Sequence, residues 1–161
     1  VVWVSSRNRL ATIFIAVLLI CILAARAMLG LQNGHVALLC LAAMVAGCDI
    51  AAYFAGRRFG GPKLAPLISP NKTRSGAAGG ILGAMLAALA VMLWLPFTMA
   101  EMVTGGIVIA VLAQAGDLME SALKRNLGVK DSGTLIPGHG GFLDRFDGYL
   151  LTLPVMCLYM M

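Results

Sequence analysis

Residues 121–147 read Ser121-Ala-Leu-Lys-Arg-Asn-Leu-Gly-Val-Lys-Asp-Ser-Gly-Thr-Leu-Ile-Pro-Gly-His-Gly-Gly-Phe-Leu-Asp-Arg-Phe-Asp147. We call this stretch the signature segment. It gathers acidic and basic side chains around a Gly-His-Gly-Gly turn, between two strongly apolar parts of the chain. Charged residues are costly within a bilayer, and such residues usually mark functional sites. The segment therefore predicts a polar, ligand-binding site carried by membrane helices.

The composition predicts an integral membrane protein. The 161 residues are 60% hydrophobic and 12% charged, whereas soluble domains are about 45–50% apolar and about 25% charged. Twelve Lys and Arg against seven Asp and Glu give a net charge of +5. This excess fits the positive-inside rule, and it also fits anionic ligands and lipid headgroups. No nucleic-acid partner is expected. The four cysteines lie in apolar stretches without a Cys-x-x-Cys pair, so we expect buried small side chains and neither a disulfide set nor a zinc site.

We expect an all-α, polytopic fold, with the whole chain (1–161) forming a single membrane domain. A transmembrane helix needs about 20 mainly apolar residues. About five membrane segments are predicted, at 10–29, 35–56, 76–95, 98–116 and 149–161, the last being short for a full span. The apolar core of the first segment is longer than the apolar region of a signal peptide, which has about 7–15 residues. We therefore expect a membrane helix there. The sequence begins with Val1, which suggests that an N-terminal part is missing.

The predicted topology gathers the positive charges on one side. The segments at 76–95 and 98–116 form a hairpin, so loop 57–75 and the signature segment emerge together. Eleven of the twelve basic residues then lie on that side, all except Arg26. Lys and Arg favour the cytoplasmic side, so we expect a cytoplasm-facing site in a bacterial inner membrane. Arg57 and Arg58 are expected to be ordinary basic loop residues.

Acidic residues recur at helical spacing around the signature segment. Asp117, Glu120, Ser121 and Lys124 fall on one face of a helix, and Asp144 and Asp147 are three residues apart. Carboxylate pairs together with substrate phosphates are the usual ligands of Mg²⁺. Solvated salt bridges at a membrane surface are the alternative. The glycine-rich turn favours a ligand site, because glycines allow close approach of the backbone and a following helix start binds anions. His139, Gly140 and Gly141 are therefore expected near substrate, with no proton-transfer role assigned to His139.

A second polar group lies in the loop at 57–75. Lys63 and Lys72 supply positive charge, prolines stiffen the loop, and hydrogen-bonding groups are expected from Ser69, Asn71 and Thr73. Asp49 lies within the preceding predicted span, about 12 Å from its end at about 1.5 Å per residue. Intramembrane acids are functional candidates. We therefore expect Asp49 to face a polar cavity, whereas Glu101 lies near the opposite membrane surface and is expected to be hydrated.

These residues carry a resemblance to a known family. The signature segment resembles that of the phosphatidate cytidylyltransferase (CDP-diacylglycerol synthase) family, through Ser-x-apolar-Lys-Arg, Lys-Asp-x-small and His-Gly-Gly-apolar-x-Asp-Arg-apolar-Asp. The Ser-Pro-Asn-Lys-Thr run at 69–73 resembles the family's other common block. The resemblance covers about residues 49–148. One departure is Ser75, which stands where many relatives carry an acid.

The resemblance implies an enzyme that converts CTP and phosphatidate to CDP-diacylglycerol and pyrophosphate in phospholipid biosynthesis. It also implies a homodimer that requires Mg²⁺, with K⁺ as a second ion. The implied metal ligands are Asp117 and Asp144, with Asp131 and Asp147 as further members. Residues implied to lie near the phosphates, and to act with Asp144 in catalysis, are Lys72, Lys124, Arg125, Lys130 and Arg145; Ser121 is expected to contact substrate.

Three alternatives remain at this point. An ion-coupled transporter would use the intramembrane acids Asp49 and Glu101. A lipid-alcohol transferase that consumes CDP-diacylglycerol would carry an Asp-Gly-x-x-Ala-Arg block, which this sequence lacks. A truncated, inactive relative is the third.

Overall fold

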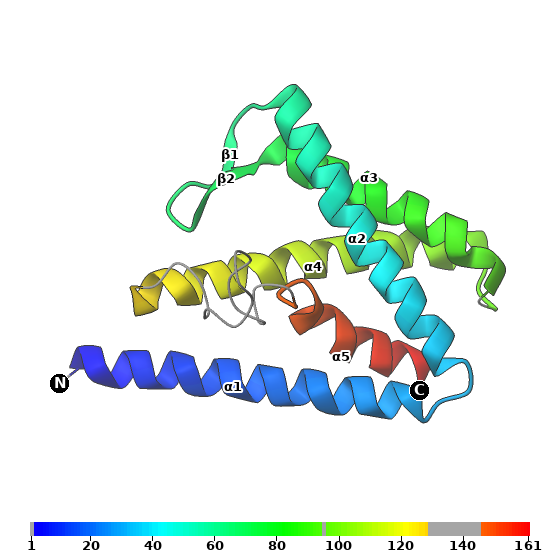
Figure 1. The fold of residues 1–161 in the computed structure, drawn as a ribbon, viewed down its shortest axis with the longest axis horizontal. Coiled ribbons are helices and arrows are strands. Elements are labelled where there is room, and N and C mark those ends of the chain that lie inside the picture. Colours follow the sequence, from blue (N-terminus) through cyan, green and yellow to red (C-terminus); the bar gives the residue numbers. More distant parts are fainter. Residues whose placement is uncertain (1, 95, 129–145) are drawn as a thin grey trace, which may run out of the picture.

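The computed structural model describes residues 2–94, 96–128 and 146–161. Five α-helices carry nearly all of this part of the chain (Figure 1). They are α1 (Val2–Leu29), α2 (Gly34–Phe59), α3 (Arg74–Val91), α4 (Met99–Leu127) and α5 (Tyr149–Met160). A short antiparallel hairpin, β1 (Lys63–Ala65) and β2 (Ser69–Thr73), separates α2 from α3, and a 3-10 turn, η1 (Met92–Trp94), follows α3.

The helices confirm the prediction of an all-α, polytopic membrane protein. Within the described ranges, three helical stretches are long and apolar enough to cross a bilayer: Gly34–Phe59, Arg74–Trp94 and Met99–Asn126. Shorter apolar helices cover Ile15–Leu29 and Tyr149–Met160. Long apolar side chains such as Leu39, Leu82 and Leu86 remain exposed on the helix surfaces. Because lipid is as apolar as these side chains, their exposure is expected in a bilayer.

The hairpin replaces part of the polar loop expected at 57–75. Helix α2 continues through Arg57 and Arg58 to Phe59 and ends at Gly60, which has a φ of 60°. Strands β1 and β2 then pair, with Lys63 opposite Thr73. Proline normally interrupts a sheet because it lacks an N–H donor, but a strand with a free edge accepts it. Pro70 can therefore lie within β2.

Helices α2 and α3 pack closely through glycine and alanine. A Cβ atom at Gly76 would lie 2.9 Å from the Ala52 carbonyl oxygen, and one at Gly83 would overlap the Gly47 carbonyl oxygen. Small residues at steps of three and four let helix backbones approach within a membrane. This contact fixes the end of α2 beside the start of α3, where the hairpin leaves the bundle (Figure 1).

Side-chain caps stabilise the starts of the two antiparallel helices α3 and α4. The Thr73 hydroxyl accepts a hydrogen bond from the Gly76 N–H at 3.1 Å and so caps α3. Thr98 and Glu101 form a capping box at the start of α4, with the Thr98 N–H donating to Glu101 Oε2 at 2.7 Å. Both devices satisfy backbone donors that a helix start leaves unpaired. Glu101 therefore has a structural role at the end of the bundle away from the hairpin.

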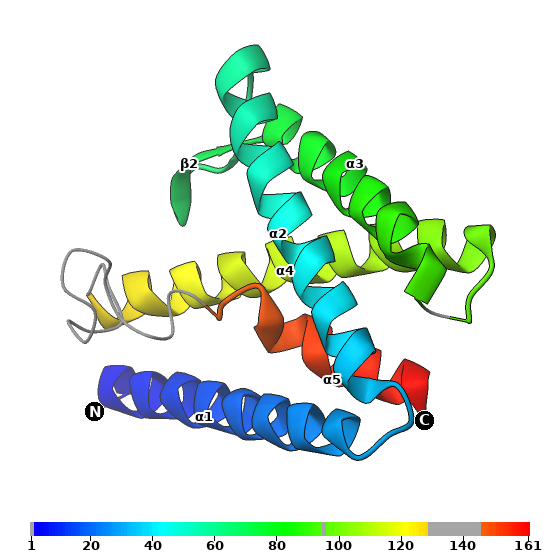
Figure 2. The ribbon, with the colours of Figure 1, turned by 45° about the vertical axis from the view of Figure 1, so that its right-hand side comes forward.

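Helix α5 packs against α1 and α4, as Figure 2 shows. The Cys21 thiol donates to the Leu150 carbonyl oxygen at 2.8 Å. All four cysteines are buried and free, which confirms the prediction that they form no disulfide. The N-terminal end of α1, the β1–β2 hairpin and the end of α4 lie toward one end of the bundle, and α5 begins near its middle (Figure 1). This arrangement brings together the segments that the topology argument placed on one side.

Candidate functional site

A cavity of about 760 Å³ lies between α2, the β1–β2 hairpin, and the facing parts of α3 and α4. Its volume falls in the range of small-molecule sites, about 300–1,000 Å³. Asp49 and Gly56 line it from α2, Lys72 from β2, and Gln114 and Asp117 from α4. The stretch from α2 to the start of α3 and the distant helix α4 therefore contribute to one cavity.

An ion pair joins the hairpin to α4. Lys72 Nζ contacts Asp117 Oδ2, and both side chains are partly buried. The Ser121 hydroxyl lies 3.4 Å from Asp117 Oδ1, which it reaches from one turn further along the helix. Asp117 and Ser121 thus share a face of α4, as the spacing predicted. Because its ammonium contacts Asp117, Lys72 holds one positive charge at the floor of the cavity.

Asp147 lies beside the same part of α4, in the turn before α5. A Cβ atom at Gly116 would lie 2.5 Å from the Asp147 carbonyl oxygen, so a glycine is needed there for the turn to approach. The Asp147 carboxylate accepts a hydrogen bond from the Gly148 N–H at 2.6 Å. Burial, and then the charge of Asp117, raise the pKa of Asp147 to about 6. The turn therefore sets a second carboxylate close enough to feel the first.

Asp49 completes a group of three neighbouring carboxylates. It is open to the cavity that it lines, and it lies within electrostatic range of Asp117, Lys72 and Asp147. The sequence argument expected Asp49 to face a polar cavity, and the structure confirms it. Three acids and one ammonium leave this end of the cavity with an excess of negative charge.

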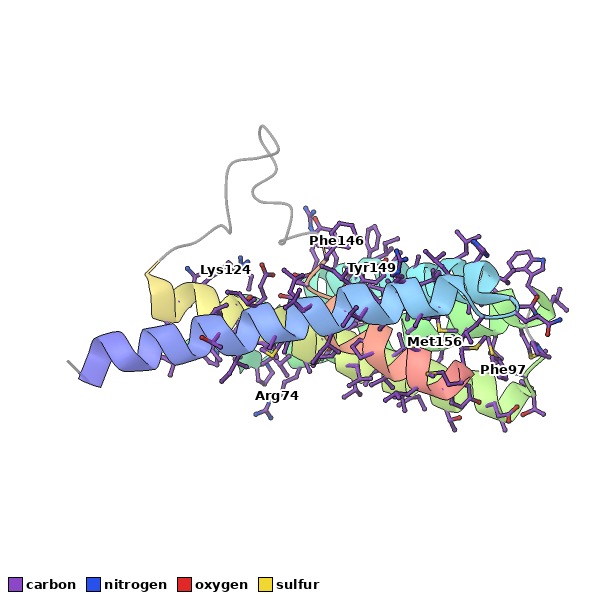
Figure 3. All side chains as sticks on the ribbon, turned by 90° about the horizontal axis from the view of Figure 1, so that it is seen from below. Arg74, Phe97, Lys124, Phe146, Tyr149 and Met156 are labelled. Atoms are coloured by element: carbon purple, nitrogen blue, oxygen red, sulfur yellow. The ribbon has the colours of Figure 1, made fainter. Side chains whose placement is uncertain are left out.

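The end of α4 carries further predicted residues. Lys124 pairs with the buried Glu120 at 3.5 Å, one helical turn away. Arg125 Nε donates to the Ile68 carbonyl oxygen at 3.4 Å and so connects α4 to the hairpin turn. In Figure 3, Lys124 lies toward the end of the bundle opposite Phe97. Arg125 therefore lies at the hairpin, and neither basic residue lines the cavity itself.

The hairpin residues divide into two groups. Asn71 lines the cavity beside Lys72. Thr73 also reaches the cavity, but its hydroxyl caps α3; Ser69 lies in β2 outside the cavity lining. Ser75 donates to the Gly60 carbonyl oxygen and lies 3.1 Å from Thr73 Oγ1, so it ties the start of α3 to the end of α2.

Seven predicted site residues lie outside the described residues: Lys130, Asp131, His139, Gly140, Gly141, Asp144 and Arg145. Conversely, the cavity lining includes polar residues that were not predicted as site residues from the sequence, among them Tyr53, Arg57 and Gln114. Gln114 donates to the Ala77 carbonyl oxygen at 3.3 Å and lies one turn before Asp117. Its polarity within an apolar span, three residues from Asp117, was the available signal.

The donor set suits a hard cation only in part. Carboxylate oxygens are the ligands that Mg²⁺ prefers, and the excess of acid over base at Asp49, Asp117 and Asp147 favours a cation. Among the described residues, no three Asp, Glu, His or Cys side chains converge in a metal-binding arrangement. A Mg²⁺ ion at this site would therefore be held by one or two carboxylates near Asp117, and substrate phosphates would supply further ligands.

The fold and cavity define an integral membrane protein with a cavity lined by charged residues at one end of its helical bundle. A model of the cytidylyltransferase family matches residues 2–161, and the chain belongs to that family. It is similar to the phosphatidate cytidylyltransferase of Brucella suis biovar 1, with 46% identity over 135 residues, which cover 78% of this chain and 47% of the relative. It is also similar to the phosphatidate cytidylyltransferase of Staphylococcus saprophyticus, with 44% identity over 110 residues, or 67% of this chain and 42% of the relative. The chain thus spans about half the length of these relatives.

Proposed function

We propose that this chain carries the site at which CTP and phosphatidate react to give CDP-diacylglycerol and pyrophosphate. The observation that carries the proposal is a cavity lined by Asp49, Lys72 and Asp117. Asp147 lies close enough to interact electrostatically with all three. Family membership and the names of the relatives support the choice of substrates. The proposed location is a bacterial inner membrane with the cavity toward the cytoplasm, and the proposed assembly is a homodimer.

The reaction brings two anions together. A phosphate oxygen of phosphatidate attacks the α-phosphorus of CTP, a new P–O bond forms, and the bond from the α-phosphorus to the bridging oxygen breaks to release pyrophosphate. The protein's task is to position the reactants and to stabilise charge. Lys72 supplies a fixed positive charge at the cavity floor. Arg125 and Lys124 extend the positive charge toward the end of α4.

Asp117, together with Asp147 or Asp49 beside it, is the described part of the proposed Mg²⁺ site. Asp144 and Asp131 are further candidate ligands from the sequence, and K⁺ is a proposed second ion. Bound there, Mg²⁺ would neutralise repulsion between the phosphates and stabilise the leaving pyrophosphate. The pairing of Asp117 with Lys72 holds this carboxylate in a fixed position. Ser121 supports that carboxylate from the same helix face.

The decisive experiment is pyrophosphate release from CTP on addition of phosphatidate, in the presence of Mg²⁺. We expect release by the purified chain, loss on chelation by EDTA, and a fall of about 10²-fold or more in Asp117→Asn. Glu101→Gln is the matched control, since it makes the same acid-to-amide change while glutamine still serves in a capping box. A chain that binds lipid and nucleotide but releases no pyrophosphate would be the inactive relative.

The transporter alternative has less support. Glu101 accepts hydrogen bonds from both the backbone N–H and the hydroxyl of Thr98, and this capping role accounts for its position. An ion pathway through Asp49 would appear as ion flux in liposomes containing the purified chain. Flux without pyrophosphate release would reverse the choice between the two functions.

A further inference from the structure

The mouth of the cavity carries a pair of residues that the reaction described above does not use. Tyr53 and Arg57 lie one turn apart on α2, and Arg57 Nη1 donates to the Tyr53 hydroxyl at 2.9 Å. Both line the cavity, and both side chains are exposed, Tyr53 by 58%. The hydrogen bond to Tyr53 restrains the guanidinium within this part of the cavity lining.

Arg57 retains donor capacity in this position. A guanidinium has five N–H donors, and only the bond to Tyr53 is found for Arg57 among the described residues. Those residues also give Arg57 no ion pair. Arginine recognises phosphate through two parallel N–H···O bonds, and a guanidinium held in place loses less freedom on binding. Its geometry therefore suits an incoming phosphate.

The distribution of charge in the cavity supports the same ligand. Asp49 and Asp117 lie with Lys72 at one part of the lining, whereas Arg57 and Lys63 supply positive charge from the end of α2 and from β1. A ligand that spans the cavity meets cations at one part and carboxylates at the other. A phosphate compound that reaches a cation held by the acids matches this pattern.

We infer that Arg57, oriented by Tyr53, is a phosphate-positioning residue at the cavity mouth. The inference rests on the proposed function and names the chemistry that this part of the cavity recognises, a terminal phosphate oxyanion. That phosphate belongs either to phosphatidate or to CTP. Arg57 lies at the C-terminal end of α2, where the helix dipole also favours a cation, so the control must share that helix end.

Arg58 provides the control. It is the next residue of α2, it is equally charged and exposed, and it is not part of the cavity lining. We compare Arg57→Gln, Arg57→Lys, Tyr53→Phe and Arg58→Gln in the full chain. KM and kcat are measured separately for dioctanoyl phosphatidate and CTP, and binding of each compound is measured without turnover.

We expect Arg57→Gln to raise KM and weaken binding about tenfold or more for one of the two substrates, the loss of a charge-assisted pair of hydrogen bonds. The affected substrate identifies which phosphate is recognised. Arg57→Lys should recover part of the loss, Tyr53→Phe should produce a smaller loss of the same kind, and Arg58→Gln should resemble the unmodified chain.

The inference is overturned if Arg57→Gln leaves both substrates unaffected, or if Arg58→Gln weakens the same substrate equally. If the unmodified chain turns over substrate and the Arg57 variants behave like it, only this inference is rejected. If the chain shows no turnover but binds a substrate in a way that depends on Arg57, only the proposed reaction is rejected.

Discussion

Lys72 of the hairpin contacts the carboxylate of Asp117 in α4, although the two residues lie on opposite sides of helix α3 in the sequence. The contact connects strand β2 to helix α4, and both elements line the cavity. The position of the hairpin and the charge of the site therefore depend on one another.

Removing Lys72 alone should lower both activity and thermal stability. Removing both partners should restore the stability but not the activity. In Lys72→Met the Asp117 carboxylate loses its partner in a partly buried site, and we expect pyrophosphate release to fall about 10²-fold. The double variant Lys72→Met/Asp117→Asn should recover thermal stability but not activity, since no isolated charge remains. Equal melting temperatures for all three proteins would show that the pair has no structural part.

The close contact of α2 with α3 predicts opposite outcomes at two glycines. Gly83→Ala places a methyl group against the Gly47 carbonyl and the Ala51 side chain, so we expect a lower melting temperature in detergent. Gly105→Ala is the matched change in α4, where a Cβ atom meets nothing within 4 Å. That variant should be neutral or more stable, because alanine favours a helix over glycine by about 0.5–1 kcal/mol. A stable Gly83→Ala protein would contradict the packing described for these helices.

The pKa of Asp147 predicts how stability depends on pH. Its pKa is about 6 in the folded chain and 3.8 ordinarily, so between these values the folded state binds a proton that the unfolded state does not. Stability from this group is therefore complete below about pH 4 and is lost as the pH rises through about 6. In EDTA, we expect the melting temperature to fall by several degrees over this interval, and the Asp147→Asn variant to lose this part of the change. If the melting temperature of the variant depends on pH in the same way, a group other than Asp147 causes the change.

The capping box of α4 predicts a measurable cost. Thr98→Ala removes the hydroxyl that accepts from the Glu101 N–H at 3.3 Å, and loss of such a cap typically costs about 1 kcal/mol. Thr98→Ser retains the hydroxyl and should behave like the unmodified chain. Both variants should keep their KM values, because this end of the bundle lies away from the cavity. A changed KM would link the two ends of α4.

The sequence predicted the membrane helices because their apolar stretches are long and nearly free of charge. It also predicted the shared face of Asp117 and Ser121, because local helix geometry determines that relationship. The hairpin was not predicted, since Pro66 and Pro70 are typical of loops and its short strands show little periodicity. Only the fold could reveal that both strands are edge strands.

Arg57 illustrates a second limit of the sequence argument. Its charge suggested a loop, but α2 continues past it because no proline or glycine interrupts 57–59. The meeting of Lys72 with Asp117 and the approach of Asp147 to Gly116 depend on helix packing, and no local pattern encodes either distance. The spacing within a helix was predictable, whereas the pairing between helices was not.

The burial of all four native thiols also makes the chain convenient for labelling. A cysteine introduced at the hairpin tip, by Leu67→Cys at a position 93% exposed, would react with a polar maleimide well ahead of the native ones. A single probe could then follow the tip as nucleotide and lipid are added, in an otherwise unmodified protein.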